Sequence, residues 1–261
     1  MKFCLGTVCW GGYLERYVNV FAENYITIFR KLVSAGINCS DIADPRIFYA
    51  NKKEEEPEIV GENTEKAIKY IEITTGKNLK ISKASKSHTD KTIMYATRNG
   101  LRGAFRKAYP EEPKVFFYFP IDDLILPEAA EELIKLSRET KPTACMFKFR
   151  VKESVQEYRA FTRPIKSPND IFPGDWGGYC AYNILNEDDC PLYPKVAIPN
   201  IAFYIELYKA GYDEYLSKDI CIKHLRHKDS HHYKTKNTEM SMEISKYLSE
   251  QKRMLKEMEC D

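Results

Sequence analysis

The sequence has no long apolar run and no excess of charge of one sign. No hydrophobic stretch approaches the roughly 20 residues that a membrane-spanning helix needs, and the first residues read as a strand rather than as a signal peptide. Lys and Arg number 40 against 38 Asp and Glu, so the net charge of +2 gives no global field for nucleic acid or a membrane. We therefore expect a cytoplasmic protein with no transmembrane segment and no nucleic-acid partner. The basic segment 223–236 is compatible with peripheral contact to an anionic membrane.

Cysteine spacings typical of metal or redox sites are also missing. The chain has eight cysteines, and none of them forms a C-x-x-C pair, which argues against a structural zinc site or a dithiol redox motif. Cys4, Cys145 and Cys221 lie in apolar strand-like runs, where a reduced cysteine packs as a small hydrophobic residue. Since the chain has 13 Phe and 18 Tyr, it is too aromatic to be disordered. The sequence predicts a folded protein with reduced thiols.

Strand-like and helix-like segments alternate along the chain. Strand patterns at 2–9 and 37–42 flank helical spacing over 13–35, and this β-α-β opening favours a parallel sheet with right-handed crossovers. Further helices are expected at 63–73, 90–108, 128–136, 200–211 and 239–258, and further strands at 79–82, 115–119, 143–151, 176–182 and 219–225. The helix over 90–108 should be interrupted or bent near Asn99 and Gly100, which are poor helix formers. We predict a single α/β domain with a mostly parallel central sheet flanked by helices.

One strand carries the most informative motif. Residues 115–119 are five consecutive apolar or aromatic residues, typical of a central strand that is buried on both faces. Pro120 should end this strand, and Asp122 and Asp123 then stand where the chain leaves the sheet. Ligands of open α/β sheets bind outside the carboxyl ends of the strands. Two carboxylates at that place suit Mg²⁺ or Mn²⁺, which are held by one or two carboxylates together with substrate phosphates and water.

A second cluster lies near the end of the chain. Four of the five histidines fall within residues 223–233. His224 and His227 lie in a predicted strand and the loop after it, so they cannot share one face as the two histidines of a helical zinc motif do. A basic, histidine-rich strand end can supply one imidazole to a metal and cations to a diphosphate. His231 and His232 read more simply as part of a solvated basic loop.

These clusters, together with Arg98-Asn99-Gly100-Leu101 and Ala104, resemble the GT-A nucleotide-sugar glycosyltransferases, especially the large family 2-type group. The resemblance covers residues 1–233, and Ile121 replaces the usual first Asp of the family's D-x-D motif. It implies a GT-A (Rossmann-like) fold, in which Asp123 binds the metal and Asp122 the donor ribose or the metal. His224 would complete the metal site, with His227 as the fallback. Residues implied to hold the nucleotide are Gly6, Thr7, Val8, Asp44 (or Asp41) and Arg98.

The resemblance also implies an activity and a division of the chain. The enzyme would move a sugar from a UDP- or GDP-linked donor to a hydroxyl of a glycan, lipid-linked or protein acceptor, with Mn²⁺ or Mg²⁺ as cofactor. The nucleotide-binding half would span residues 1–127 and the acceptor-binding half 128–233, followed by a helical extension over 234–261. The oligomeric state is open.

The catalytic base is where the sequence departs from the family. Inverting members begin a helix with a Glu-Asp pair, and Pro199-Asn200 occupies that place here. The candidate replacements are Asp175, beside Trp176, and the acidic run that contains Asp188. Trp176 with Tyr179 could form an apolar platform for an acceptor sugar, or Trp176 could simply fill the core. Whether the reaction inverts or retains the anomeric configuration stays open.

Two other functions are compatible with the same motifs. A nucleotidyltransferase should have a Gly-rich loop with Lys or Arg directly after the first strand, but Trp10 and Glu15 stand in that segment. A non-catalytic nucleotide- or glycan-binding protein would explain the missing Glu-Asp pair. The trio of Asp122, Asp123 and His224 argues against that reading, because nothing structural requires it.

Overall fold

The structure is a computed structural model, and it describes residues 1–51, 60–86, 88, 90–151, 154–156, 179–195 and 199–224. Its helices are α1 (Gly11–Ser34), α2 (Glu62–Thr75), α3 (Asp90–Ala108), α4 (Ala129–Arg138) and α5 (Pro199–Lys209). Its strands are β1 (Lys2–Trp10), β2 (Arg46–Ala50), β3 (Lys80–Lys83), β4 (Lys114–Tyr118), β5 (Leu124–Ile125), β6 (Thr143–Val151), β7 (Ser154–Gln156), β8 (Cys180–Ile184) and β9 (Asp213–His224). The predictions for Asp175, Trp176, His227 and the extension over 234–261 lie outside the described residues.

All the described strands join one nine-stranded sheet of order β3-β2-β1-β4-β8-β6-β9-β5, with β7 paired to β6. β1 is parallel to β2 and β4, β2 to β3, and β6 to β9. β8 runs antiparallel to both β4 and β6, and β5 and β7 are antiparallel to their partners. Six strands therefore point one way and three the other, so the mostly parallel sheet is confirmed.

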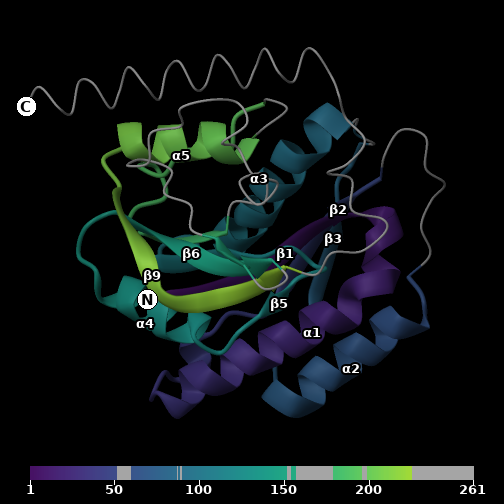
Figure 1. The fold of residues 1–261 in the computed structure, drawn as a ribbon. Helices are drawn as coiled ribbons and strands as arrows, with labels where there is room; N and C mark the ends of the chain where they lie inside the picture. The colour runs from purple at the N-terminus through teal and green to yellow at the C-terminus, as the bar shows by residue number, and fades with distance from the viewer. Residues whose placement is uncertain are drawn as a thin grey trace, which may run out of the picture.

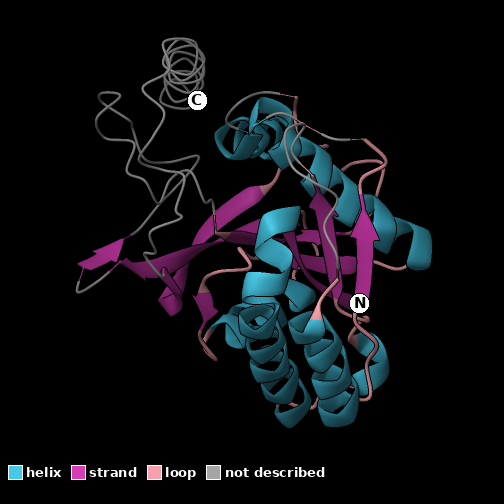
Figure 2. Cartoon of the chain, turned by 90° about the vertical axis from the view of Figure 1, so that its right-hand side faces the viewer, coloured by secondary structure: helices cyan, strands magenta, loops and turns pink. Residues whose placement is uncertain are grey.

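Helices cover both faces of the sheet and form a three-layer α/β/α sandwich. α1, α2 and α4 lie on one side, and α3 and α5 lie on the other (Figure 1). Seen from the side, the strands run between the two groups of helices (Figure 2). Each face has its own buried cluster, one built on α1, α2 and α4 and the other on α3 and α5.

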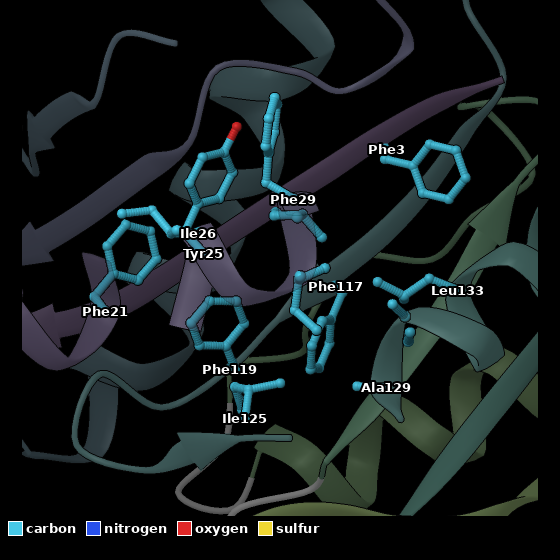
Figure 3. Packing of buried hydrophobic residues seen from close by; sticks show 14 of the residues in the cluster. Phe3, Phe21, Tyr25, Ile26, Phe29, Phe117, Phe119, Ile125, Ala129 and Leu133 are labelled. Atoms are coloured by element: carbon cyan, nitrogen blue, oxygen red, sulfur yellow. The ribbon is translucent and has the colours of Figure 1, made fainter. Parts of the chain in front are cut away.

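β4 is a central strand of the sheet and contributes residues to both clusters. All five of its residues are buried, as the unbroken apolar run predicted. Phe117 faces α1 and α4, and Phe119 just beyond the strand stacks on Phe21 of α1 with ring centroids 5.4 Å apart (Figure 3). Phe116, on the opposite face, packs edge-on against Phe105 of α3 at 5.9 Å. The chain therefore leaves the sheet after β4 from a fixed position.

Two local predictions were wrong. The second strand is β2, at Arg46–Ala50, and the predicted strand over 37–42 contains the short 3-10 helix Cys39–Asp41 instead. α3 runs without interruption from Asp90 to Ala108. Gly100 allows that helix to approach the sheet, since a Cβ there would lie 2.4 Å from the ring of Phe48 in β2. The glycine in this helix thus serves packing between helix and sheet.

Among the described residues, no helix combines the length and the apolar character that crossing a membrane requires.

Candidate functional site

Several chain segments that are far apart in the sequence meet at one edge of the sheet. β1, β2 and β4 are parallel, so their last residues, Trp10, Ala50 and Tyr118, point toward the same edge. β9 also ends there, since it is antiparallel to β5, which directly follows Asp123. This is the edge at which ligands of α/β sheets bind.

The turn that carries Asp122 and Asp123 is tied to the sheet and to α1. The Thr7 hydroxyl donates a hydrogen bond of 2.6 Å to the carbonyl oxygen of Phe119. Asn24, 2% exposed in α1, donates from Nδ2 to the carbonyl oxygen of Asp123 at 2.6 Å and accepts at Oδ1 from the backbone N–H of Ile125 at 2.9 Å. The Asn24 side chain therefore holds the backbone on both sides of Leu124, as a neighbouring strand would.

The Asp123 side chain is held as well. It is 1% exposed, and its Oδ2 accepts a hydrogen bond of 2.5 Å from the Tyr179 hydroxyl. Burial raises the pKa of Tyr179 well above its ordinary value, and the nearby carboxylate of Asp123 raises it further, so this phenol stays protonated and donates. Asp122 is less deeply buried than Asp123.

Contrary to our prediction, Tyr179 does not form a platform for an acceptor sugar. Its side chain is 4% exposed, and its ring packs against Phe149 of β6 with centroids 4.8 Å apart. Its backbone carbonyl accepts the N–H of Phe147 at 2.8 Å. A side chain enclosed in this way cannot offer a ring face to a sugar, and its hydroxyl is directed at Asp123 instead.

The backbone of His224 lies next to that of Asp123. The β5–β9 ladder pairs Leu124 with Lys223 and Ile125 with Ile222, so its continuation by one residue sets Asp123 opposite His224. On its other side, His224 is paired with Val151 of β6. The structure describes the backbone of His224 but not its side chain. Within the described side chains no group of three or more His, Cys, Asp or Glu forms a metal-binding cluster.

Arg98 is a buried cation on the other face of β4. It is 2% exposed and lies between two aromatic rings, with its guanidinium carbon 4.7 Å from the ring centroid of Tyr118 and 5.1 Å from that of Tyr193. Its Nε and Nη1 have no hydrogen-bond partner in the part of the chain that the structure describes. The side chain of the neighbouring Asn99 makes two hydrogen bonds, of 2.8 and 2.9 Å, to the backbone of Tyr193. These two bonds keep Tyr193 beside Arg98.

Asp44 and Asp188 do not join this edge. Asp44 precedes β2 and lies about 20 Å along the extended chain from Ala50, at the other end of that strand. Its Oδ1 accepts a hydrogen bond of 3.1 Å from the backbone N–H of Asn78, which lies just before β3. Asp188 follows β8, whose last residue is paired with Lys114 at the amino end of β4. It is exposed and forms an ion pair of 2.9 Å with Arg106. Both roles that we had predicted for these residues therefore fail on position.

Gly6, Thr7 and Val8 lie inside β1 rather than at its end. Gly6 is paired on both sides, with Arg46 and with Tyr118, and a Cβ on it would meet backbone at 2.8 Å. β1 continues to Trp10, which packs against Tyr13 with ring centroids 4.1 Å apart and is only partly buried. Trp10 and Asn51, which follows β2, are the edge residues that sequence reasoning missed. The Trp-Gly-Gly sequence at the end of the first strand was the available signal for Trp10.

Comparisons with known proteins agree with this architecture. No family model matches the sequence, and no curated protein matches it. Crystal structures of S. aureus TarS 1-349 align with TM-scores of 0.56 in complex with UDP-GlcNAc and 0.54 in complex with UDP. Each is 12% identical, and the alignments cover 98% and 96% of this chain and 70% and 65% of those chains. A further TarS structure has a TM-score of 0.50 and 13% identity, over 87% of this chain and 37% of that one.

Another crystal structure of TarS 1-349 is covered over only 60% of its length, so this chain spans less than two thirds of it. At 12–13% identity the likeness concerns the fold. The likeness confirms the GT-A fold that was expected from the sequence.

Proposed function

We propose, starting from the GT-A fold that this chain shares with TarS, that the protein is a glycosyltransferase that uses a nucleoside-diphosphate sugar. The observation that carries the proposal is the β5–β9 register, which brings the turn with Asp122 and Asp123 to the end of β9 at the carboxyl edge of the sheet. A UDP-linked donor is favoured over a GDP-linked one because two of the aligned TarS structures are complexes with UDP-GlcNAc and UDP. The acceptor would be a hydroxyl of a glycan, lipid or protein.

The residues at this edge fit a divalent cation. Two adjacent carboxylates and an imidazole suit Mn²⁺ or Mg²⁺, which take one or two carboxylates and complete their shell with substrate phosphates and water. We propose that Asp123 and His224 hold the cation, with Asp122 directed to the donor ribose or to the cation. When bound, the cation would neutralise negative charge that develops on the diphosphate leaving group.

Two further residues, Trp10 and Arg98, would bind and orient the donor. Trp10 is a partly exposed aromatic side chain at the end of β1, where it could stack on a nucleobase. Arg98 is a buried guanidinium whose Nε and Nη1 lack a partner among the described residues, which suits an anionic group of the ligand. If the reaction inverts configuration, Asp175 is our proposed base, because a general base is favoured by apolar surroundings and Trp176 follows it in the sequence. A retaining reaction would need no such base.

Ligand-dependent stabilisation tests the proposal. We expect UDP or UDP-GlcNAc with Mn²⁺ to raise the melting temperature, while GDP and CDP under the same conditions raise it less. Asp123→Asn should abolish the Mn²⁺-dependent part of the shift. Asp188→Asn is the matched control, because Asp188 is exposed at the opposite edge of the sheet.

Activity is then measured as Mn²⁺-dependent release of UDP from UDP-GlcNAc. Loss of this release in Asp123→Asn, but not in Asp188→Asn, supports an enzyme. Binding without release in the native protein would indicate a non-catalytic binding protein, and formation of pyrophosphate from UTP and a sugar phosphate would indicate a nucleotidyltransferase. No stabilisation of the folded protein by any nucleotide diphosphate would contradict the proposal.

A further inference from the structure

The hydrogen bond between Tyr179 and Asp123 joins the turn after β4 to the start of β8. The two residues are 56 positions apart in the sequence, and their atoms are 2.5 Å apart. Both side chains are almost fully buried, at 4% and 1% exposure. Nothing in the local sequence of either segment requires this contact, so its presence needs an explanation from the site.

The position of Tyr179 is set by the sheet. Its carbonyl oxygen is bonded to the N–H of Phe147 in β6 at 2.8 Å, and the next residue, Cys180, is paired with Met146. The ring is further confined by Phe149, 4.8 Å away. Because β8 runs antiparallel to β4, its first residues lie at the same edge as the turn that carries Asp123. The hydroxyl of Tyr179 is thus a donor held in place by contacts with β6 and by the start of β8.

We propose that Tyr179 is a positioning residue, whose hydroxyl orients the Asp123 carboxylate for binding of a divalent cation. Its hydrogen bond to Oδ2 restricts the rotation of the carboxylate. Asn24 fixes the backbone of the same residue from α1, so backbone and side chain are oriented by two different elements. A carboxylate held in this way binds metal without first losing rotational freedom. This inference rests on the proposed function, because it concerns the same cation site.

A hydrogen bond that only stabilises the fold would have other effects. Its loss would lower the melting temperature and leave the affinity of the folded protein for Mn²⁺ unchanged. A positioning bond affects the affinity for Mn²⁺ in the folded protein, and removal of such an outer partner typically weakens metal binding about 10- to 100-fold.

The test compares Tyr179→Phe with Tyr182→Phe. Tyr179 directly precedes β8 and Tyr182 lies within it. Each change removes one buried phenol oxygen and keeps the aromatic ring. Tyr182 is 0% exposed, lies on the opposite face, and its hydroxyl has no hydrogen-bond partner among the described residues. Free Mn²⁺ is measured by electron paramagnetic resonance in titrations of each folded variant with saturating UDP. Binding of UDP without metal is measured by calorimetry, and folding by circular dichroism.

We expect at least a tenfold weaker affinity for Mn²⁺ in Tyr179→Phe, with unchanged metal-free UDP binding, and native affinity in Tyr182→Phe. Equal Mn²⁺ affinity in the native protein and Tyr179→Phe would refute the role of Tyr179 while leaving the proposed function intact. Equal weakening in both variants would also refute it, since the effect would then be one of packing. No Mn²⁺ binding by the native protein would overturn the cation site itself, and this inference with it.

Discussion

Replacement of Asn24 by Ala should destabilise the protein more than a typical surface substitution does. The side chain makes two hydrogen bonds, of 2.6 Å to the carbonyl oxygen of Asp123 and 2.9 Å from the N–H of Ile125. Both hydrogen bonds are buried. Ala would leave a buried acceptor and a buried donor unpaired, at about 1–3 kcal/mol each. Since a water molecule entering the space would satisfy part of this demand, we expect a total loss of about 2–4 kcal/mol.

Urea unfolding followed by circular dichroism measures this loss as a change in the midpoint at constant m-value. Asn38→Ala is the matched control, because among the described residues the exposed Asn38 side chain makes only a 3.5 Å hydrogen bond to Asp41, and such changes usually stay within about 0.5 kcal/mol. A loss below about 1 kcal/mol for Asn24→Ala would refute the inference that Asn24 clamps the turn. Mn²⁺-dependent UDP binding should also weaken in the fraction of Asn24→Ala that remains folded, since the backbone of Asp123 loses its support.

Two further predictions concern the packing of helices. The carboxylate of Glu15 in α1 accepts the backbone N–H groups of Gly61, Asn63 and Thr64 at the start of α2, at 3.1, 2.6 and 3.1 Å. Burial raises the pKa of Glu15, but the hydrogen bonds from Thr64, Asn63 and Gly61 outweigh it and the pKa is lowered. Because the folded pKa lies below the unfolded value of about 4.3, this stabilisation is fully present above that value and is lost as the pH falls through the folded pKa. Glu15→Gln should therefore lower the free energy of unfolding by about 1 kcal/mol at pH 7. In urea unfolding at pH 3, the difference in free energy of unfolding between the variant and the native protein should be smaller. A difference that is independent of pH would contradict this explanation. Gly100→Ala should destabilise the protein by about 1–3 kcal/mol, because the new Cβ would lie 2.4 Å from the Phe48 ring. Gly103→Ala is the control: a Cβ there has nothing within 4 Å, so this change should stabilise the protein by up to about 1 kcal/mol. Equal effects of the two changes in thermal unfolding would contradict the packing argument and show that α3 can move away from β2.

The α/β fold class was largely accessible from local pattern, and the resemblance to a known family added the GT-A assignment. The apolar run at 115–119 gave the buried central strand, and helical spacing gave α3 with the same ends that the structure has. The segment 37–42 misled because its apolar ends read as a strand, while the chain pairs the alternating Ile47 and Tyr49 of β2 with β1 instead. Pattern at this scale reports which residues are buried but not which neighbouring segment receives them.

The candidate site depended on pairing across the sheet. The sequence by itself determined that two carboxylates follow a buried strand and that an imidazole ends a later one. Only the tertiary structure decided that Asp123 lies opposite His224, that Tyr179 donates to Asp123, and that Asp188 lies at the far edge. The physical reason is that burial and periodicity are fixed by a few neighbouring residues, whereas the register between strands is fixed by the packing of the whole sheet.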